Sequence, residues 1–238
     1  MASYVLIGGG DTRLSETKLI DEKIVELSGV SKPKILFIPT ASNESPEYIS
    51  SIKAAYSNIT SCDFDWLSLS VQNIEQEINK IDEADIVYVG GGNTKMMIDK
   101  WKKHGVIERI NKNANRNIVF SGLSAGSICW FEYGISDSTS FENNNDWNYS
   151  IVECLGHISG YHCPHYDERL QESNFNNFIN DFDNDIIAIE NNCAIVIGEK
   201  IEIVKSNEKK NAYIINGRKK KRTILDNILA NDIFGGKS

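Results

Sequence analysis

Short apolar segments alternate with amphipathic ones through the first two-thirds of the chain, and this alternation constrains the fold most. The apolar segments are four or five residues long, as buried strands are, and apolar residues at helical spacing follow them, as at Ile20, Ile24 and Leu27. The segments predicted as strands are residues 4–7, 34–38, 64–67, 85–89 and 117–120. Strands separated by helices form a parallel sheet covered on both faces. We therefore expect an α/β fold with a doubly wound, mostly parallel sheet.

The pattern changes after Phe182, where short strands follow one another without helices between them. These strands are predicted at 186–190, 194–198, 201–204 and 212–215. Asn216-Gly217 is a hairpin turn signal, so we expect antiparallel hairpins and a β-rich edge over residues 186–225. No repeat or evident linker interrupts the 238 residues, and we expect a single domain over 1–238.

Composition excludes several classes of protein. Hydrophobic residues make up 41% and charged residues 24%, as in soluble globular proteins, and no segment approaches the roughly 18 apolar residues of a membrane span. The N-terminus lacks the basic region of a signal peptide. The five cysteines include no CxxC pair, so we expect reduced thiols, a cytoplasmic protein and no metal site. The net charge of −8 argues against nucleic acid or an anionic membrane as partner.

One basic run, Arg218–Arg222, stands out in this acidic chain. It follows the Asn216-Gly217 turn, so a solvated hairpin arm is the first interpretation. A docking patch is the second.

The strongest chemical signal is Gly122-Leu123-Ser124-Ala125-Gly126, which follows the last predicted parallel strand and precedes a helix-like stretch. G-x-S-x-G between a strand and a helix is the pattern of a nucleophile elbow. Glycines on both sides allow a tight turn that exposes the Ser124 hydroxyl at the carboxyl edge of the sheet, where working groups collect. The sequence thus predicts a nucleophilic serine.

A serine nucleophile needs a base, and the chain has four histidines. His104 lies at a predicted helix end beside Gly105, where a structural role is favoured. The other three, His157, His162 and His165, lie in one short segment. An α/β-hydrolase would carry its base close to the C-terminus, but no histidine follows His165. The elbow therefore indicates a different doubly wound fold.

Two glycine triplets also end predicted strands. Gly90–Gly92 could bring a backbone N–H to the elbow as an oxyanion donor, with the N–H of Ala125 as its partner, or it could be a plain turn. Gly8–Gly10 begins like a dinucleotide fingerprint, but Arg13 stands where the third glycine is needed. No P-loop motif occurs, and we expect no cofactor.

Three ordered motifs, Val89–Thr94, Gly122–Gly126 and Cys163–Tyr166, resemble those of the peptidase E group of serine peptidases, family S51. That group includes aspartyl dipeptidase and, more distantly, cyanophycinase. The resemblance implies the flavodoxin-like fold of class I glutamine amidotransferases, with serine in place of their cysteine. It also implies Ser124 as nucleophile, His165 as base and the N–H groups of Gly92 and Ala125 as the oxyanion hole.

The resemblance leaves the acid of the triad open. In peptidase E the acid lies between the elbow helix and the histidine, which favours Asp137 over Glu132. Amidotransferases place their acid two residues beyond the histidine, and Asp167 has that spacing from His165. Asp137 is therefore the predicted acid, and Asp167 is the alternative.

Other residues near the motifs depart from the family or match no role in it. Arg169 is the candidate for binding a substrate carboxylate, but it lies nearer His165 than the family's arginine does, so specificity for an N-terminal aspartate is not implied. His157 and His162 match no catalytic position and are expected in the wall or on the surface. The loop 143–149 either covers the site or is a solvated loop.

These observations predict a serine peptidase that hydrolyses short peptides, as a dipeptidase does, through a Ser-His-Asp triad and an acyl-enzyme. One alternative is a catalytically silent, amidotransferase-like binding protein. Another is a cyanophycinase-like hydrolase of β-linked aspartyl peptides. The expected partner is a short peptide substrate, and a homodimer is allowed for.

Overall fold

A computed structural model of the chain describes residues 1–142 and 147–234, and two sheets carry its fold. The strands of the first sheet are β1 (Ser3–Ile7), β2 (Lys34–Ile38), β3 (Asp63–Trp66), β4 (Ile86–Val89), β5 (Val119–Leu123), β10 (Cys193–Ile197) and β11 (Ile201–Lys205). Their order is β11-β10-β1-β5-β4-β2-β3. The five strands predicted first are parallel, whereas β10 and β11 form an antiparallel hairpin at the edge.

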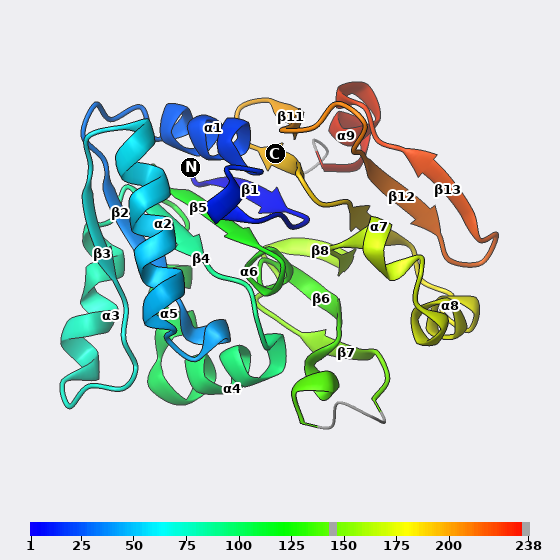
Figure 1. Cartoon of the computed structure of the whole chain (residues 1–238), viewed down its shortest axis with the longest axis horizontal. Coiled ribbons are helices and arrows are strands. Elements are labelled where there is room, and N and C mark those ends of the chain that lie inside the picture. The colour runs from blue at the N-terminus through cyan, green and yellow to red at the C-terminus, as the bar shows by residue number, and fades with distance from the viewer. Residues whose placement is uncertain (143–146, 235–238) are drawn as a thin grey trace.

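Helices cover both faces of this sheet, as predicted (Figure 1). The helices on one face are α1 (Lys18–Ser28) and α2 (Pro46–Ile59), and those on the other are α3 (Ile74–Glu83), α4 (Thr94–His104) and α5 (Val106–Asn113). Side chains alternate between the faces along β1, so Val5 and Ile7 pack with α1 and α2 while Leu6 packs with the opposite layer. The parallel strands are buried on both faces, which explains their continuous apolar runs.

A second sheet lies beside the first, at the right of Figure 1. Its strands are β6 (Phe131–Ser136), β7 (Ser150–Glu153), β8 (Ile158–Cys163), β9 (Ile186–Ile189), β12 (Ala212–Asn216) and β13 (Lys221–Ile224). The order is β13-β12-β9-β8-β6-β7, in which β6, β8 and β9 run parallel. The C-terminal strands predicted over 186–225 are therefore divided between two sheets.

The sequence did not predict β6, β7 and β8. Glycines interrupt two of them, Gly134 in β6 and Gly160 in β8, and interior glycine disfavours a strand. Gly134 is needed there because a Cβ would lie 2.1 Å from Cγ2 of Ile128. Glu132, expected on the elbow helix, instead lies exposed on β6.

The remaining helices are α6 (Ala125–Ile128), α7 (Tyr166–Arg169), α8 (Ser173–Asn180) and α9 (Asn227–Phe234). Among the residues described, no helix has the length and apolar character needed to cross a membrane.

The basic run Arg218–Arg222 forms the predicted hairpin between β12 and β13. Every residue of β13 is exposed, in agreement with a solvated arm. Two of the cations also make internal contacts. The Arg222 guanidinium lies 4.8 Å from the ring centroid of Tyr213, and the Lys220 ammonium donates to the carbonyls of Ile179 and Phe182.

Candidate active site

Ser124 occupies a sharp turn between β5 and α6. Its φ of 58° and ψ of −114° are unusual for a residue with a side chain, and such strain is concentrated at functional sites. Residues 118–123 and 125–131 are buried, whereas Ser124 is partly exposed. The turn thus presents one hydroxyl at the end of a buried strand, as the elbow pattern predicts.

The two glycines of the elbow are required by close backbone contacts. A Cβ on Gly122 would lie 2.1 Å from the carbonyl oxygen of Gly126, and one on Gly126 would lie 2.0 Å from that of Val89. This confirms the expectation that the turn is too tight for flanking side chains.

Ser124 and His165 are both attached by backbone hydrogen bonds at the end of β1. The N–H of Ser124 donates to the carbonyl of Ile7 at 3.1 Å, and the N–H of His165 donates to the carbonyl of Gly8 at 3.0 Å. Two residues far apart in the sequence are therefore attached to Ile7, the last residue of β1, and to Gly8, which follows it. Within the described residues the Ser124 hydroxyl and the imidazole form no hydrogen bond with each other. Catalytic hydrogen bonds are often long until substrate binds.

Gly9, the middle residue of the Gly8–Gly10 triplet, lies against the imidazole of His165. A Cβ on Gly9 would lie 2.4 Å from Nδ1 of His165 and 2.0 Å from Oδ1 of Asn191. The carbonyl of Gly9 accepts from the N–H of Asn192 at 2.9 Å, which fixes the adjoining loop. The triplet therefore makes room for the histidine and its partner, a role that its comparison with a dinucleotide motif did not indicate.

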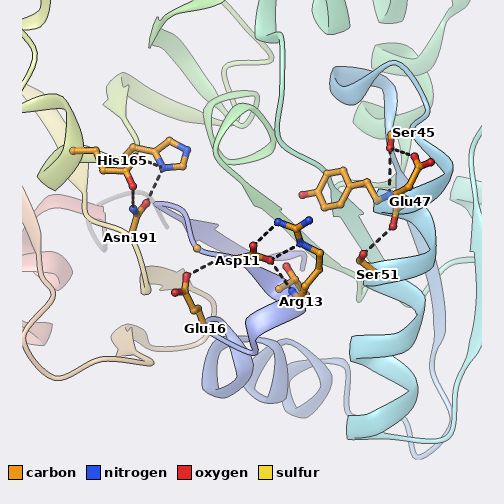
Figure 2. Close-up of a pocket in the computed structure, with 12 residues that line it drawn as sticks. Asp11, Arg13, Glu16, Ser45, Glu47, Ser51, His165 and Asn191 are labelled. Carbon is orange, nitrogen blue, oxygen red and sulfur yellow. Dashed lines mark hydrogen bonds and ion pairs between the residues drawn. The ribbon is translucent and has the colours of Figure 1, made fainter.

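The side chain that orients His165 is Asn191, which follows β9 (Figure 2). Nδ1 of His165 lies 2.7 Å from Oδ1 of Asn191. An amide oxygen only accepts, so this contact assigns the hydrogen to Nδ1 and leaves Nε2 free to act as a base. Asn191 is held in turn, since its Nδ2 donates to Glu168 at 2.6 Å and its N–H donates to Asp167 at 3.0 Å.

Both carboxylates predicted as triad acids have other partners. Oδ2 of Asp137 lies 3.2 Å from Nη2 of Arg169, and Asp167 pairs with Lys210 as well as with the N–H of Asn191. Within the described part of the chain, neither carboxylate is within hydrogen-bond distance of a ring nitrogen of His165. The sequence reasoning missed Asn191 because it considered only acidic residues for the third position.

Arg169 is buried, with 5% of its surface exposed. Its guanidinium donates to the carbonyl of Pro164 at 3.2 Å, to the Tyr149 hydroxyl and to Asp137. The side chain proposed for a substrate carboxylate is thus engaged inside the protein. Of the loop 143–149, residues 143–146 lie outside the described residues, and the ring of Tyr149 contacts the guanidinium of Arg169.

Burial lowers the pKa of His165, and the positive charge of Arg169 lowers it further. The hydrogen bond to Asn191 opposes this shift by stabilising the imidazolium. The net direction is downward from the ordinary value, so the imidazole is neutral near pH 7 and able to accept a proton.

The predicted oxyanion amides are both available. Gly92 has φ of 136°, and a Cβ there would lie 2.2 Å from the carbonyl oxygen of Ala41. Among the residues that the structure describes, the N–H groups of Gly92 and Ala125 donate to no protein acceptor. Each is therefore free to donate to an oxyanion.

The other histidines make structural contacts. His104 ends α4 beside Gly105, as predicted. His157 lies between the Tyr4 hydroxyl, 2.9 Å from Nδ1, and Asn111. His162 is fully buried, with Nε2 2.8 Å from Oγ of Ser127.

A cavity of about 510 Å³ opens beside His165 and Asn191 (Figure 2). Four carboxylate side chains and one guanidinium contribute to its wall, namely Asp11, Glu16, Glu47, Glu168 and Arg13. Asp11 already binds Arg13 through two hydrogen bonds of 3.0 and 2.6 Å. The remaining charge of the wall is negative.

Comparison with known proteins identifies the family of this chain. The family model described as peptidase family S51 matches residues 4–204. The uncharacterized peptidase YgaJ of Bacillus subtilis (strain 168) is 33% identical over 168 residues, which cover 70% of each chain. A peptidase E of Actinobacillus pleuropneumoniae serotype 5b (strain L20) is 27% identical over 150 residues, covering 58% of this chain and 62% of that one.

The crystal structure of a peptidase from an acI-B1 actinobacterium superposes with a TM-score of 0.69. The superposed region covers 95% of this chain and 94% of the actinobacterial chain, at 18% identity, so the two share the α/β fold. The chain belongs to peptidase family S51, and it is a peptidase of the serine-hydrolase type.

Proposed function

We propose that this peptidase hydrolyses short peptides through an acyl-enzyme formed on Ser124, with His165 as the base. One observation carries the proposal. The backbones of these two residues are attached to the carbonyls of Ile7 and Gly8, so that a strained, partly exposed serine and a neutral imidazole occupy the same end of β1.

The chemistry follows from the groups at this edge. Nε2 of His165 takes the proton of Ser124 as Oγ attacks the peptide carbonyl. The N–H groups of Gly92 and Ala125 donate to the oxyanion of the tetrahedral intermediate. His165 then passes the proton to the leaving amine, and water attacks the acyl ester by the same route.

We assign the third position to Asn191 instead of Asp137 or Asp167, because its amide oxygen accepts from Nδ1. Papain-like enzymes use a Cys-His-Asn arrangement in the same way. A neutral partner holds the tautomer and the ring orientation, but it stabilises the imidazolium less than a carboxylate does.

The cavity beside His165 indicates the size of the substrate. Its volume of about 510 Å³ is in the range of sites for small ligands, and a dipeptide or slightly longer peptide is of this size. The engagement of Arg169 with Asp137 argues against its use for an N-terminal aspartate.

The test is hydrolysis of a dipeptide library by the wild type, Ser124→Ala and His165→Ala, with His104→Ala as the control histidine. In each active-site variant kcat should fall roughly 10³-fold or more, because the nucleophile and the base act as a unit and the loss of either removes the contribution of both. A fluorophosphonate should label the wild type at Ser124. A wild type that cleaves no library member and is never labelled would contradict the proposal.

Two further measurements separate the alternatives. A silent binding protein would be stabilised by dipeptides without turnover, equally in wild type and Ser124→Ala. A cyanophycinase-like enzyme would cleave β-linked aspartyl dipeptides in preference to α-linked ones.

A further inference from the structure

We infer that the hydroxyl of Tyr48 is a third donor to the oxyanion that forms during acyl transfer. This inference rests on the proposed function and extends its machinery to α2, an element outside the motifs found in the sequence.

The position of the hydroxyl is set by the Gly90–Gly92 loop. The N–H of Gly91 donates to the Tyr48 oxygen at 3.2 Å. Gly91 itself adjoins the nucleophile, since a Cβ on it would lie 3.3 Å from Cβ of Ser124. The tyrosine oxygen is thus bound to Gly91, which precedes the proposed oxyanion donor Gly92 in the chain and adjoins Ser124.

The hydrogen of this hydroxyl points to a role in binding. The oxygen already accepts from Gly91, so the O–H is left to donate, and the described residues provide it with no acceptor. Tyr48 lines the same cavity as His165 and Asn191. Burial raises the pKa of Tyr48 to about 12, so the hydroxyl keeps its proton at neutral pH.

Both the ring and the backbone of Tyr48 are held in place. The ring packs edge-on against Phe37, with ring centroids 5.2 Å apart, and a Cβ on Gly90 would lie 2.9 Å from its Cε1. Oγ of Ser45 accepts from the N–H of Tyr48 at 3.3 Å and caps the first turn of α2. A donor fixed in this way needs little reorganisation as charge develops on the substrate oxygen.

The experiment compares Tyr48→Phe with wild type on the best dipeptide of the library. Loss of one oxyanion donor should lower kcat roughly 10²- to 10³-fold with little change in KM. The affinity for a peptide aldehyde, which mimics the transition state, should fall by a similar factor.

Tyr56→Phe is the matched control, because Tyr56 lies on the same helix and its hydroxyl already donates to buried Asp21 at 3.2 Å. It should reduce the urea midpoint and leave kcat unchanged.

A second variant separates donation to the substrate from support of Gly91. Incorporation of 3-fluorotyrosine at position 48 makes the hydroxyl a better donor and a poorer acceptor. A donor role predicts kcat at or above the wild-type value at pH 7, whereas a role only in accepting from Gly91 predicts a lower kcat.

If the wild type cleaves dipeptides and Tyr48→Phe keeps the wild-type kcat and the wild-type affinity for the analogue, the inference is overturned and the proposed function stands. A lower kcat with fluorotyrosine would also overturn the inference. A wild type without peptidase activity would overturn the proposed function and this inference together.

Discussion

At the residue scale, the site depends on residues that have no side chain. Gly8 and Gly9 continue β1, and their carbonyls receive the N–H groups of His165 and Asn192. The space above them is already filled, by the backbone of Glu190 over Gly8 and by the His165 and Asn191 side chains over Gly9. These two glycines have different neighbours and should respond differently to the same methyl group.

We expect Gly9→Ala to abolish most activity with little loss of stability, because its Cβ would displace two side chains, Asn191 at 2.0 Å and His165 at 2.4 Å. Gly8→Ala should instead destabilise the fold by at least about 1–3 kcal/mol, because its Cβ would lie 2.2 Å from the backbone oxygen of Glu190. Urea unfolding and dipeptide hydrolysis measured on both variants check this. Equal stability losses in the two would show that the Gly9 neighbours cannot move.

The pKa of His165 gives a second expectation at this scale. The base must be neutral, and its pKa is lowered, so kcat/KM should rise with pH and reach half its maximum below the ordinary histidine value of about 6.5. Asn191→Asp places a carboxylate beside Nδ1, which favours the imidazolium and should move the rise of kcat/KM to higher pH. The profile of kcat/KM against pH, with Asp137→Asn for comparison, measures the shift. If kcat/KM of Asn191→Asp reaches half its maximum at the same pH as the wild type, Asn191 is excluded as the partner of the base.

At the element scale, one buried hydrogen bond joins the two elements that carry the site. Oγ of Ser127 in α6 donates to Nε2 of His162 in β8 at 2.8 Å, while Nδ1 donates to the carbonyl of Ile187 at 2.9 Å. Burial lowers the pKa of His162 to about 4, so the ring remains a neutral acceptor at neutral pH. Ser124 immediately precedes α6 and His165 follows β8, so this bond links the elements that carry the proposed nucleophile and base.

Ser127→Ala leaves Nε2 of a buried ring unpaired, which should cost about 1–3 kcal/mol of unfolding free energy. It should also lower kcat, because α6 and β8 lose their polar link. Ser121→Ala is the control, since Ser121 is equally buried and its hydroxyl donates to the carbonyl of Val87 within the first sheet. Urea unfolding and kcat measured on both variants should show a stability loss in each and a kcat loss only in Ser127→Ala.

At the scale of the whole molecule, charge and the cavity wall favour the same substrates. The chain carries a net charge of −8, and the wall beside His165 has four carboxylates against one paired guanidinium. Such a field attracts cationic peptides and repels acidic ones.

We therefore expect dipeptides with a lysine or arginine side chain to have a lower KM than those with aspartate, by roughly 5- to 10-fold at low salt, corresponding to about 1 kcal/mol. The difference should shrink as salt is added, and a neutral dipeptide should show no such dependence. Glu47→Gln and Glu168→Gln should each reduce the preference. A salt-independent preference for aspartyl peptides would contradict this account of the cavity.

Local pattern was enough to predict the first sheet. Its parallel strands are short apolar runs buried on both faces, so the sequence alone indicates them, and the elbow glycines mark where backbones must approach closely. The second sheet was less visible, because Gly134 interrupts β6 and Gly160 interrupts β8, and an interior glycine disfavours a strand. Which carbonyl receives which N–H at the end of β1 depends on residues far apart in the chain.

The sequence by itself determined the parallel α/β layers, the nucleophile elbow and the segment that carries His165. These depend on contacts between neighbours in the chain, whose spacing the sequence displays directly. Only the tertiary structure decided that Asn191 is the hydrogen-bond partner of His165, that Arg169 is engaged by Asp137, and that the Tyr48 hydroxyl accepts from Gly91. Each of these contacts joins separate elements, and a hydrogen bond between them is formed only when the two sheets and their helices have packed.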